Sequence, residues 1–545
     1  PFVSALLDRF FNLGTDKGSF VEKIRLFILK NLPEKRSSRE LDFEELLDSE
    51  ARQLLNDAPF LEGLKGADLN RKIFMVTSRL ANRILYQYTN RFMSLSMRAG
   101  FFDYLNTAGT IGLVHLLISP YYLAFHHQHK GKELIREIAE RLPEIPFPPA
   151  EEKIALFTDT LDEINGVAMT IRRLIRTAQE RGISLTVITS GDGSQATPAG
   201  VKQFQAVGDF VLPEYPELKL SFPPILDVLN YIEKEEITRI HVSTPGTVGL
   251  LGLLIARLMN IPVAGTYHTE IPQYVRSLTD DEFLEQVAWN YMIWFYNQME
   301  EVMVPSASTR EQLFSHGLPL EKMKPLPRWV DTELFSPDKR IERFWLGRGL
   351  NARTTLLYVG RVSREKALDL LVESFCRLVD EGTELCLAVV GDGPYRTEME
   401  QSLAGYPALF TGYLQGEELQ QAYASADLFV FPSATDTFGN VVLEAQASGL
   451  PVIVSDAGGP RELMVGGETG MVFSAGNQDE LTGAIRSMTT NRLILSLMGE
   501  NARSFVLAKA PHASDTYSTI LQPGLRPGAG YSTFGESPCP QPSSC

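Results

Sequence analysis

Cysteine is scarce in this sequence, which has only four cysteines among 545 residues: Cys376, Cys386, Cys539 and Cys545. Their positions do not show the spacing that is typical of metal-ligand pairs. Small secreted domains supplement a thin core with a dense disulfide framework, which four scattered cysteines do not provide. The cysteine content therefore favours a reducing compartment.

A basic excess is also missing. The sequence has 51 Lys and Arg against 67 Asp and Glu, which gives a formal net charge of −16. Proteins that bind nucleic acid without specificity need a basic surface to replace the counterions of the phosphates. We therefore expect no nucleic-acid partner, although a local basic face is compatible with this total.

Long apolar runs are absent as well. The stretch Ile111–Phe125 is interrupted by Ser119 and Pro120, and the run Val248–Leu258 contains Arg257. A helix that crosses a bilayer needs about 20 apolar residues. We predict no membrane-spanning helix and a cytoplasmic protein, with a peripheral position at the inner face of the membrane as an open alternative.

The first 142 residues show a helical pattern. Apolar residues recur every three or four positions, the period of an amphipathic helix, in Phe2–Leu13, Glu22–Leu32, Phe43–Leu55 and Asn70–Met97. The sequence begins at Pro1 and not at a methionine, so one interpretation of residues 1–142 is the end of a larger domain. Residues 143–152 are rich in proline and are expected to form a linker.

From Lys153 onwards, short apolar strands alternate with helices. The expected strands are 154–157, 185–188, 209–212, 239–243, 263–267 and 301–304 in a first series, and 356–359, 385–390, 428–431 and 452–454 in a second. This alternation is typical of parallel sheets covered on both faces. We therefore predict an α/β fold with two facing Rossmann-like, doubly wound domains at 153–337 and 338–505, and a ligand cleft between them. Residues 506–545 form a C-terminal segment that we expect to be disordered from about residue 523.

A short segment with two important cations follows the expected strand 356–359. It reads Gly360-Arg361-Val362-Ser363-Arg364-Glu365-Lys366, so that Arg361 and Lys366 are five positions apart. Arginine holds phosphate oxygens with a planar fork, and lysine offers a compact charge. At the carboxyl end of a strand such a pair suits a diphosphate, while a solvated basic turn is the alternative interpretation.

A second segment, Thr435–Ala445, combines an acidic loop with a helix start. Asp436 follows the expected strand 428–431, and Gly439 opens a helix whose free N–H groups can bind an anion. Glu444 comes about two helical turns after Asp436, and its carboxylate is suited to ribose hydroxyls. Taken alone, an ordinary loop residue and a solvated helix charge explain Asp436 and Glu444 better.

Together these segments resemble glycosyltransferase family 4, the retaining nucleotide-sugar transferases with the two-domain GT-B fold. The resemblance extends from about Lys153 to Met488. It also rests on shorter motifs, which are Phe157-Thr158-Asp159-Thr160, Asn165-Gly166-Val167, Gly265-Thr266-Tyr267-His268-Thr269, Val330–Phe335, Val390–Pro394 and Ser455–Pro460. The pattern is most similar to the branch of GDP-mannose-dependent α-mannosyltransferases and sulfolipid synthases.

The resemblance implies a role for each matching residue. Arg361 and Lys366 would bind the donor diphosphate and stabilise it as it departs, and Glu444 would hold the ribose. Asp436 stands where the family motif more often has glutamate. His268 would lie beside the donor sugar and the acceptor, with a backbone-bonded histidine at a strand end as its alternative. The implied donor site further includes Gly166, Gly360, Phe438, Gly439 and Asn440.

The resemblance also implies the reaction. It is a retaining transfer of a hexosyl group, with mannose as a candidate, from a nucleotide-diphosphate sugar to a hydroxyl of a lipid, glycan or small molecule. We expect no metal cofactor, because the sequence has no Asp-x-Asp pair and because cations and helix amides can stabilise the leaving diphosphate. The alternative is a catalytically silent GT-B module that binds or scaffolds. A phosphorylase or epimerase is disfavoured, since no segment suggests a lysine for pyridoxal phosphate.

Two further features have structural alternatives. His115, His126, His127 and His129 are close in sequence, but no cysteine or carboxylate pair accompanies them, so a polar helix end is favoured over a metal site. Residues 69–102 carry six Lys and Arg and no Asp or Glu. They are candidates for an anionic membrane surface that presents a lipid-linked acceptor, although pairing with acidic neighbours is favoured in this acidic chain.

Two positions depart from the family pattern. Trp329 stands where the family usually has glycine at the domain junction. Ala510-Pro511-His512 interrupts the helix that usually crosses back onto the first domain. The two departures predict an altered hinge and a weaker domain closure.

Overall fold

The computed structural model of the chain describes residues 43–94, 101–141, 151–161, 166–192, 197–212, 215–326, 330–509 and 520. The helices predicted at 2–13 and 22–32, most of the linker, Trp329, residues 510–512 and the tail from residue 523 lie outside these ranges. The chain divides into two compact units, Pro1–Gly265 with Asn290–Glu300, and Thr266–Trp289 with Glu301–Cys545.

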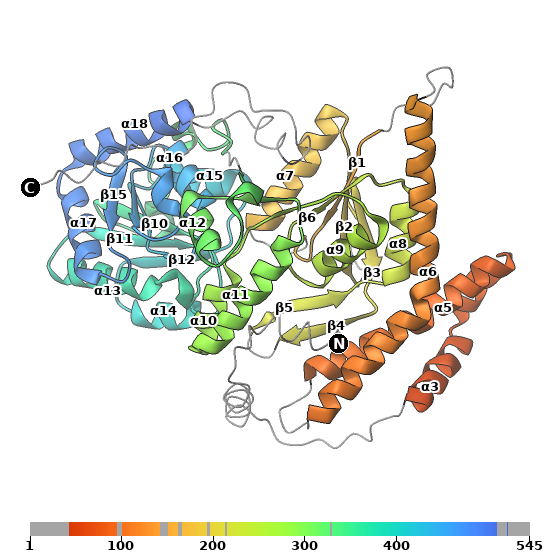
Figure 1. Ribbon diagram of the computed structural model, residues 1–545. Coiled ribbons are helices and arrows are strands. Elements are labelled where there is room, and N and C mark those ends of the chain that lie inside the picture. The colour runs from red at the N-terminus through yellow and green to blue at the C-terminus, as the bar shows by residue number, and fades with distance from the viewer. Residues whose placement is uncertain are drawn as a thin grey trace, which may run out of the picture. The chain divides into compact units, whose positions relative to one another are not determined.

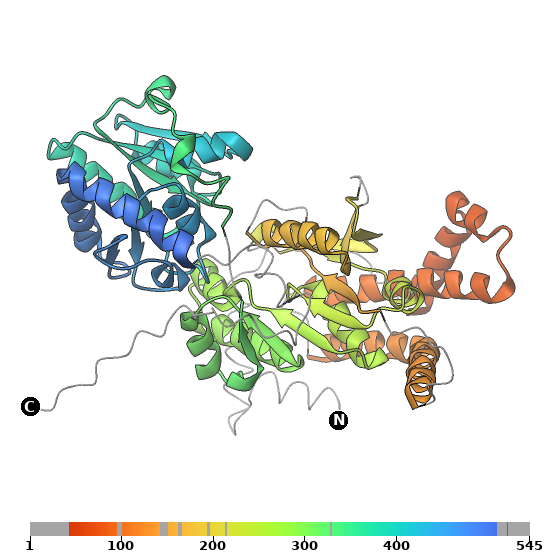
Figure 2. The same cartoon turned by 90° about the horizontal axis from the view of Figure 1, so that it is seen from above.

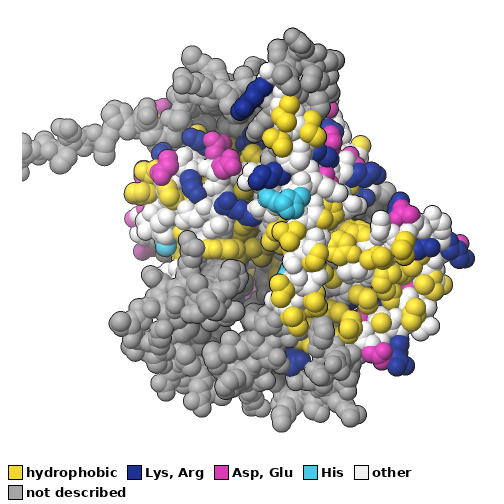
Figure 3. All heavy atoms as spheres, turned by 45° about the vertical axis from the view of Figure 1, so that its right-hand side comes forward, with side chains coloured by type: hydrophobic (Ala, Val, Ile, Leu, Met, Phe, Trp, Pro, Cys, Tyr) yellow, Lys and Arg dark blue, Asp and Glu magenta, His cyan; other side chains and the backbone are white. Residues whose placement is uncertain are grey.

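The described part of the N-terminal region is helical, as predicted. Its described elements are α3 (Phe43–Leu55), α4 (Ala58–Leu64), α5 (Leu69–Ser94) and α6 (Phe101–Arg141). Figure 3 shows hydrophobic side chains gathered over this region, and those exposed on α6 include Leu113, Leu116, Leu117 and Leu123. Among the described residues, no helix has the length and apolar character needed to cross a membrane.

Polar contacts attach α5 to the first Rossmann-like sheet. The side-chain oxygen of Asn82 accepts a hydrogen bond from Ile225 N (3.1 Å), at the start of α8 (Ile225–Lys234). Ser78 Oγ donates to Asp227 Oδ2 in the first turn of the same helix (2.7 Å). Residues of α5 therefore cap a helix that follows them by more than 140 positions in the sequence.

We expect Asn82→Ala to lower the free energy of unfolding by about 2 kcal/mol, because it removes an N-terminal cap and a buried hydrogen-bonding group. Asn82 is 6% exposed. Asn70→Ala changes an exposed residue of the same helix and serves as the matched control. Thermal unfolding of the two variants measures the difference. Equal melting temperatures would contradict the capping role of α5.

The first sheet is built from short apolar strands. These are β1 (Lys153–Phe157), β2 (Ser184–Gly191), β3 (Val201–Gln205), β6 (Arg239–Val242), β7 (Val263–Thr266), β8 (Glu301–Val304) and β9 (Met323–Pro325), in the order β3-β2-β1-β6-β7-β8-β9. Every pair of this sheet with a described register is parallel. Its helices, besides α8, are α7 (Gly166–Arg181), α9 (Thr247–Met259), α10 (Ile271–Thr279), α11 (Glu282–Asn297) and α12 (Ala307–Ser315) (Figure 1).

One predicted strand belongs elsewhere. We expected residues 209–212 to join the parallel sheet, but β4 (Gly208–Leu212) pairs with β5 (Tyr215–Phe222) in a separate two-stranded antiparallel sheet. The physical reason is the connection between them. Two residues can join antiparallel strands, whereas a parallel pair needs a crossover of a dozen residues or more.

The second sheet has six parallel strands in the order β12-β11-β10-β13-β14-β15. They are β10 (Thr354–Val359), β11 (Leu385–Val390), β12 (Ala408–Gly412), β13 (Leu428–Phe431), β14 (Val452–Ser455) and β15 (Gly470–Phe473). Every position of β10, β11, β13 and β14 is buried. These four strands form the centre of the hydrophobic core of the unit.

Helices accompany the second sheet throughout. They are α13 (Leu368–Asp380), α14 (Arg396–Ser402), α15 (Gly416–Ala424), α16 (Asn440–Ala447), α17 (Gln478–Thr490) and α18 (Arg492–Lys509) (Figure 2). Parallel strands buried along their whole length and connected by helices are the signature of a doubly wound sheet. The structure thus confirms an α/β fold with two Rossmann-like sheets after a helical region.

Candidate active site

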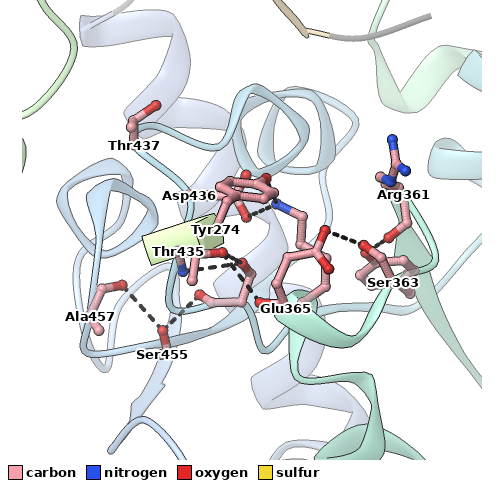
Figure 4. Close-up of polar contacts among 12 residues, drawn as sticks. Tyr274, Arg361, Ser363, Glu365, Thr435, Asp436, Thr437, Ser455 and Ala457 are labelled. Atoms are coloured by element: carbon pink, nitrogen blue, oxygen red, sulfur yellow. Dashed lines mark hydrogen bonds and ion pairs between the residues drawn. The ribbon is translucent and has the colours of Figure 1, made fainter. Parts of the chain in front are cut away.

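The strand order of the second sheet reverses between β10 and β13. The chain builds outward from β10 to β12 and then returns to the other side of β10 with β13. Ligands of such sheets bind beside the carboxyl ends of the strands at this reversal. The two loops that start there, after Val359 and after Phe431, carry the two segments that the sequence indicated. Figure 4 shows that side chains of both loops meet at Asp436.

Lys366 is the buried charge of this site. Its Nζ lies 2.8 Å from Asp436 Oδ2 and 3.4 Å from Tyr274 Oη, and the residue is 6% exposed. Burial lowers the pKa of Lys366, but the charge of Asp436 and its hydrogen bond raise it more, so the net pKa lies above the usual value. Lys366 therefore stays a cation at physiological pH.

Arg361 belongs to the same loop and has a different environment. It is partly exposed, and its carbonyl oxygen accepts a hydrogen bond from the buried Tyr358 Oη (2.7 Å). This bond fixes the backbone, while Figure 4 shows the guanidinium standing apart from Asp436. The loop thus presents one cation held in a buried ion pair and a second cation that is partly exposed.

Glycine allows the ends of β10 and β11 to touch. Gly360 N donates to Val390 O (3.0 Å), and a Cβ at Gly391 would lie 1.9 Å from Gly360 O. Gly391 also has a φ of +132°, which side-chain-bearing residues rarely adopt. The close approach of the two strand ends explains why glycine follows both strands.

The loop after β13 is held from three directions. Thr435 Oγ1 donates to Glu365 O (3.2 Å), and Gly459 N donates to Asp436 O (2.9 Å). Thr437 Oγ1 donates to His268 O (2.7 Å). These bonds fix the position of Asp436 beside Lys366 before any ligand arrives.

His268 follows β7 and is partly exposed. The contact that joins it to the loop after β13 is made by its carbonyl oxygen, through Thr437, and the role of its ring stays a prediction.

The start of α16 carries the remaining predicted donor-binding residues. Phe438 is 5% exposed, and Gly439 takes a φ of +94° as the N-cap of the helix. Gly439 has no side chain with which to cap this helix, and the first N–H groups of the helix, beginning with that of Asn440, lie at this end. The Glu444 carboxylate accepts a hydrogen bond from the buried Tyr423 Oη (3.1 Å). Its predicted ribose contact would share the carboxylate with this tyrosine.

The strand order of the first sheet also reverses, between β1 and β6. Gly166 is the exposed first residue of α7 after β1. The start of α9 is occupied by the chain itself, because the Asp159 carboxylate accepts hydrogen bonds from Val248 N (2.8 Å) and Thr244 Oγ1 (2.6 Å). Burial raises the pKa of Asp159, and these hydrogen bonds oppose the rise. The predicted donor contact of Gly166 stays a prediction.

Two residues of the site were missed at the level of sequence. Tyr274 lies on α10. Its side chain is uncharged, and its hydroxyl oxygen accepts a hydrogen bond from Lys366 Nζ (3.4 Å). Glu270 precedes α10 and is 4% exposed. Burial first, and then the charge of Asp436, raise its pKa to about 7, while a hydrogen bond from Gln273 and the charge of Lys366 oppose the rise. The sequence signal that could have pointed to Glu270 is its position, two residues after His268.

The histidines singled out in the sequence have separate structural partners. His115 Nδ1 lies 3.0 Å from Tyr122 Oη, and His126 Nδ1 lies 2.7 Å from Leu258 O. They lie inside the 41-residue helix α6, so the expected helix end was wrong. Across the part of the chain that the structure describes, no group of three or more His, Cys, Asp or Glu side chains is arranged to hold a metal ion.

Two family models match the chain. The model described as "Glycosyltransferase Family 4" matches residues 164–334, and the model described as "Glycosyl transferases group 1" matches residues 353–491. The first covers Gly166 and His268, and the second covers both loops of the site in the second sheet.

Curated relatives match over a similar range. A sulfoquinovosyl transferase of Arabidopsis thaliana is 32% identical over 361 residues, which are 64% of this chain and 69% of the relative. A GDP-mannose-dependent alpha-mannosyltransferase of Mycobacterium tuberculosis is 29% identical over 372 residues, which are 66% of this chain and 93% of the relative.

Solved structures share the fold. A sucrose-phosphate synthase from Thermosynechococcus elongatus superposes with a TM-score of 0.55 at 21% identity, over 66% of this chain and 94% of that one. The Anabaena protein HepE, solved with UDP and glucose, gives a TM-score of 0.55 at 18% identity, over 68% and 98% of the two chains.

Proposed function

Because the chain belongs to glycosyltransferase family 4 and is a glycosyltransferase, we propose that it transfers a hexosyl group from a nucleotide-diphosphate sugar to an acceptor hydroxyl, with retention of configuration. The observation that carries this proposal is the buried Lys366, whose charge is preserved beside the strand-order reversal on the loop that also bears Arg361. The acceptor is a lipid, a glycan or a small molecule.

The chemistry follows from where charge develops. The bond between the anomeric carbon and the diphosphate oxygen breaks, and negative charge grows on the phosphate oxygens. Preplaced cations and helix N–H groups stabilise such charge without reorganising. Arg361, Lys366 and the start of α16 would supply them, and we propose that transfer needs no metal ion.

The acceptor attacks from the face that the diphosphate leaves. A new bond forms between the acceptor oxygen and the anomeric carbon, and the proton of the acceptor hydroxyl passes to an oxygen of the departing diphosphate. His268 would lie beside the sugar and the acceptor in this step. Asp436 would act through Lys366, by holding it in place until the diphosphate takes over the contact.

The names of the relatives narrow the donor. The mycobacterial relative is named for GDP-mannose, and the plant relative for a sulfoquinovosyl group. We propose a hexosyl donor with mannose as the first candidate.

The donor is identified by incubating the full chain, in the presence of EDTA, with a panel of GDP- and UDP-sugars and candidate acceptors. Nucleotide release and product mass are followed. We expect turnover of at least one donor and a strong loss of turnover in Arg361→Met. Arg353→Met, at the opposite end of β10, is exposed and serves as the control. Donor binding without turnover, unaffected by Arg361→Met, would favour a silent binding module.

A lipid acceptor would bring the enzyme to a membrane surface. On α5, Arg83 contacts Glu50 at 3.1 Å and Arg79 contacts Asp57 at 3.6 Å, whereas Arg71 is exposed. Each free cation near an anionic membrane contributes about 1 kcal/mol. We therefore propose that any contact of residues 69–102 with a membrane is weak and salt-sensitive. Sedimentation with vesicles of anionic lipid at low and high salt tests this.

A further inference from the structure

Glu270 is a buried acid that the transfer mechanism above does not use. It ends the loop after β7 and directly precedes α10, where its carboxylate makes no cap of its own helix. Instead it receives a hydrogen bond from Gln273 and interacts electrostatically with Asp436 and Lys366. Only 4% of the residue is exposed. A carboxylate in such a place needs a compensating cation or a proton.

The charges around Glu270 decide whether a cation or a proton compensates its carboxylate. The titratable groups of this site are His268 and Tyr274 from its own segment, Glu365 and Lys366 from the loop after β10, Tyr358 from β10, and Asp436 from the loop after β13. The buried cation among them, Lys366, already pairs with Asp436 at 2.8 Å. Glu365 accepts a hydrogen bond from Ser363 Oγ (2.5 Å). A buried carboxylate, that of Glu270, and a partly buried one, that of Asp436, thus lie in a site with one buried ammonium group.

We propose that Glu270 holds a proton beside the ion pair of Lys366 and Asp436, and that Glu270 is a positioning residue which sets the pH range of donor binding. This proposal rests on the proposed function, because the donor diphosphate is the anion concerned. With the proton in place, Lys366, Asp436 and Glu270 sum to zero charge. When the proton is lost, the sum becomes −1 at the place where a diphosphate has to bind.

The pKa of Glu270 supports this arrangement, because burial and Asp436 raise it to about 7. This pKa sets the direction in which donor binding changes with pH. Below this pH Glu270 keeps its proton, and the diphosphate meets a group of residues with no net charge. As the pH rises through 7, Glu270 ionises and repels the donor. An arriving diphosphate also takes Lys366 from Asp436, which strengthens the need for the proton.

Donor binding measured against pH tests the proposal. Calorimetry with GDP-mannose and with UDP-glucose is suitable, because the diphosphate of a nucleotide sugar does not titrate in this range. We expect the Kd of the wild type to rise about tenfold between pH 6 and pH 8.5. A bound donor that raises the pKa of Glu270 by about one unit binds the protonated protein about tenfold more tightly than the ionised protein. Glu270→Gln mimics the neutral acid and should change less than twofold over this range. Glu270→Asp keeps a titrating group and should keep the rise.

One control variant and the donor-binding measurement itself separate this proposal from the proposed function. Glu282→Gln removes an exposed carboxylate of α11 and should show the wild-type pH dependence. If neither donor binds to the wild type or the variants, the proposed function fails for these donors. If the donors bind and Glu270→Gln shows the same rise as the wild type, the proton on Glu270 is overturned and the proposed function stands.

A measurement without donor checks the proton directly. A pKa that is raised by folding makes the protein less stable as the pH rises through it. Glu270→Gln should therefore melt at a higher temperature than the wild type at pH 8, and the difference should shrink at pH 5. A constant difference between the two proteins across this range would overturn the proposal.

Discussion

Lys366→Met is expected to lower kcat/KM for the nucleotide-sugar donor by about 10²–10³-fold. The reason is the loss of a preplaced cation where negative charge grows on the leaving diphosphate, a type of loss that has this size in other enzymes. Lys366 is 6% exposed and is held at 2.8 Å from Asp436, so neither water nor a mobile side chain can replace its charge. Steady-state kinetics with the donor found by the panel measures the effect.

The same substitution affects stability, and the two effects are separable. Removing Lys366 leaves Asp436, which is partly buried, without its cation, and this alone is expected to lower the melting temperature. The double variant Lys366→Met with Asp436→Asn should recover much of the stability and none of the activity. Lys324→Met, an exposed lysine on β9, is the control for both measurements. Full activity in the double variant would contradict the assigned role of Lys366.

Gly459→Ala is the second change for which we expect a large effect. A Cβ at this position would lie 2.2 Å from Thr437 O and 2.7 Å from Phe438 Cα, so the loop after β13 has to move. Gly459 N also donates to Asp436 O, and the displacement reaches the partner of Lys366 directly. We expect kcat/KM to fall about 10²-fold, because small errors in the placement of reacting groups have costs of this order.

The matched control is Gly483→Ala. Gly483 lies inside α17 and a Cβ there has open space, so alanine should keep activity and stabilise the helix slightly. Circular dichroism should show the same secondary structure in both variants. If Gly459→Ala keeps the kinetics of the wild type, the fixed position of Asp436 in the loop after β13 is not needed for transfer.

The central strands could be predicted from the sequence because they are apolar along their whole length. The segments at 356–359, 385–390, 428–431 and 452–454 all lie within strands of the second sheet. The edge strands β3, β12 and β15 were missed, and unlike the central strands they are partly exposed. The hairpin β4–β5 was misassigned because its pairing depends on a partner that the local pattern does not reveal.

The site could be predicted only as far as it is local. Arg361, Lys366 and Asp436 were predicted as site residues because each follows a recognisable strand within a few residues. Lys366 and its partner Asp436 are 70 positions apart in the sequence, and Tyr274 and Lys366 are 92 positions apart. Glu270 is even farther from Asp436. No local sequence pattern encodes contacts over such separations. The Tyr423 contact of Glu444 was hidden for the same reason.

The surface of the helical region shows how a charge pattern can mislead. Residues 69–102 have no acidic side chain, yet Arg79 of this stretch contacts Asp57, the N-cap of α4, and Arg83 contacts Glu50 of α3. A run of like charges along the chain is therefore not a run of free charges in the fold.

The central claim is that Arg361 and Lys366 hold the diphosphate of the donor without a metal ion. Calorimetric titration with GDP and GMP, and with UDP and UMP, in the presence of EDTA tests it most directly. We expect the wild type to bind one of the diphosphates at least about tenfold more tightly than its monophosphate, since each charged hydrogen bond to phosphate contributes about 1.5–3 kcal/mol. Arg361→Met and Lys366→Met should reduce this preference, and the double variant should abolish it. An unchanged preference for the diphosphate in the double variant would contradict the claim.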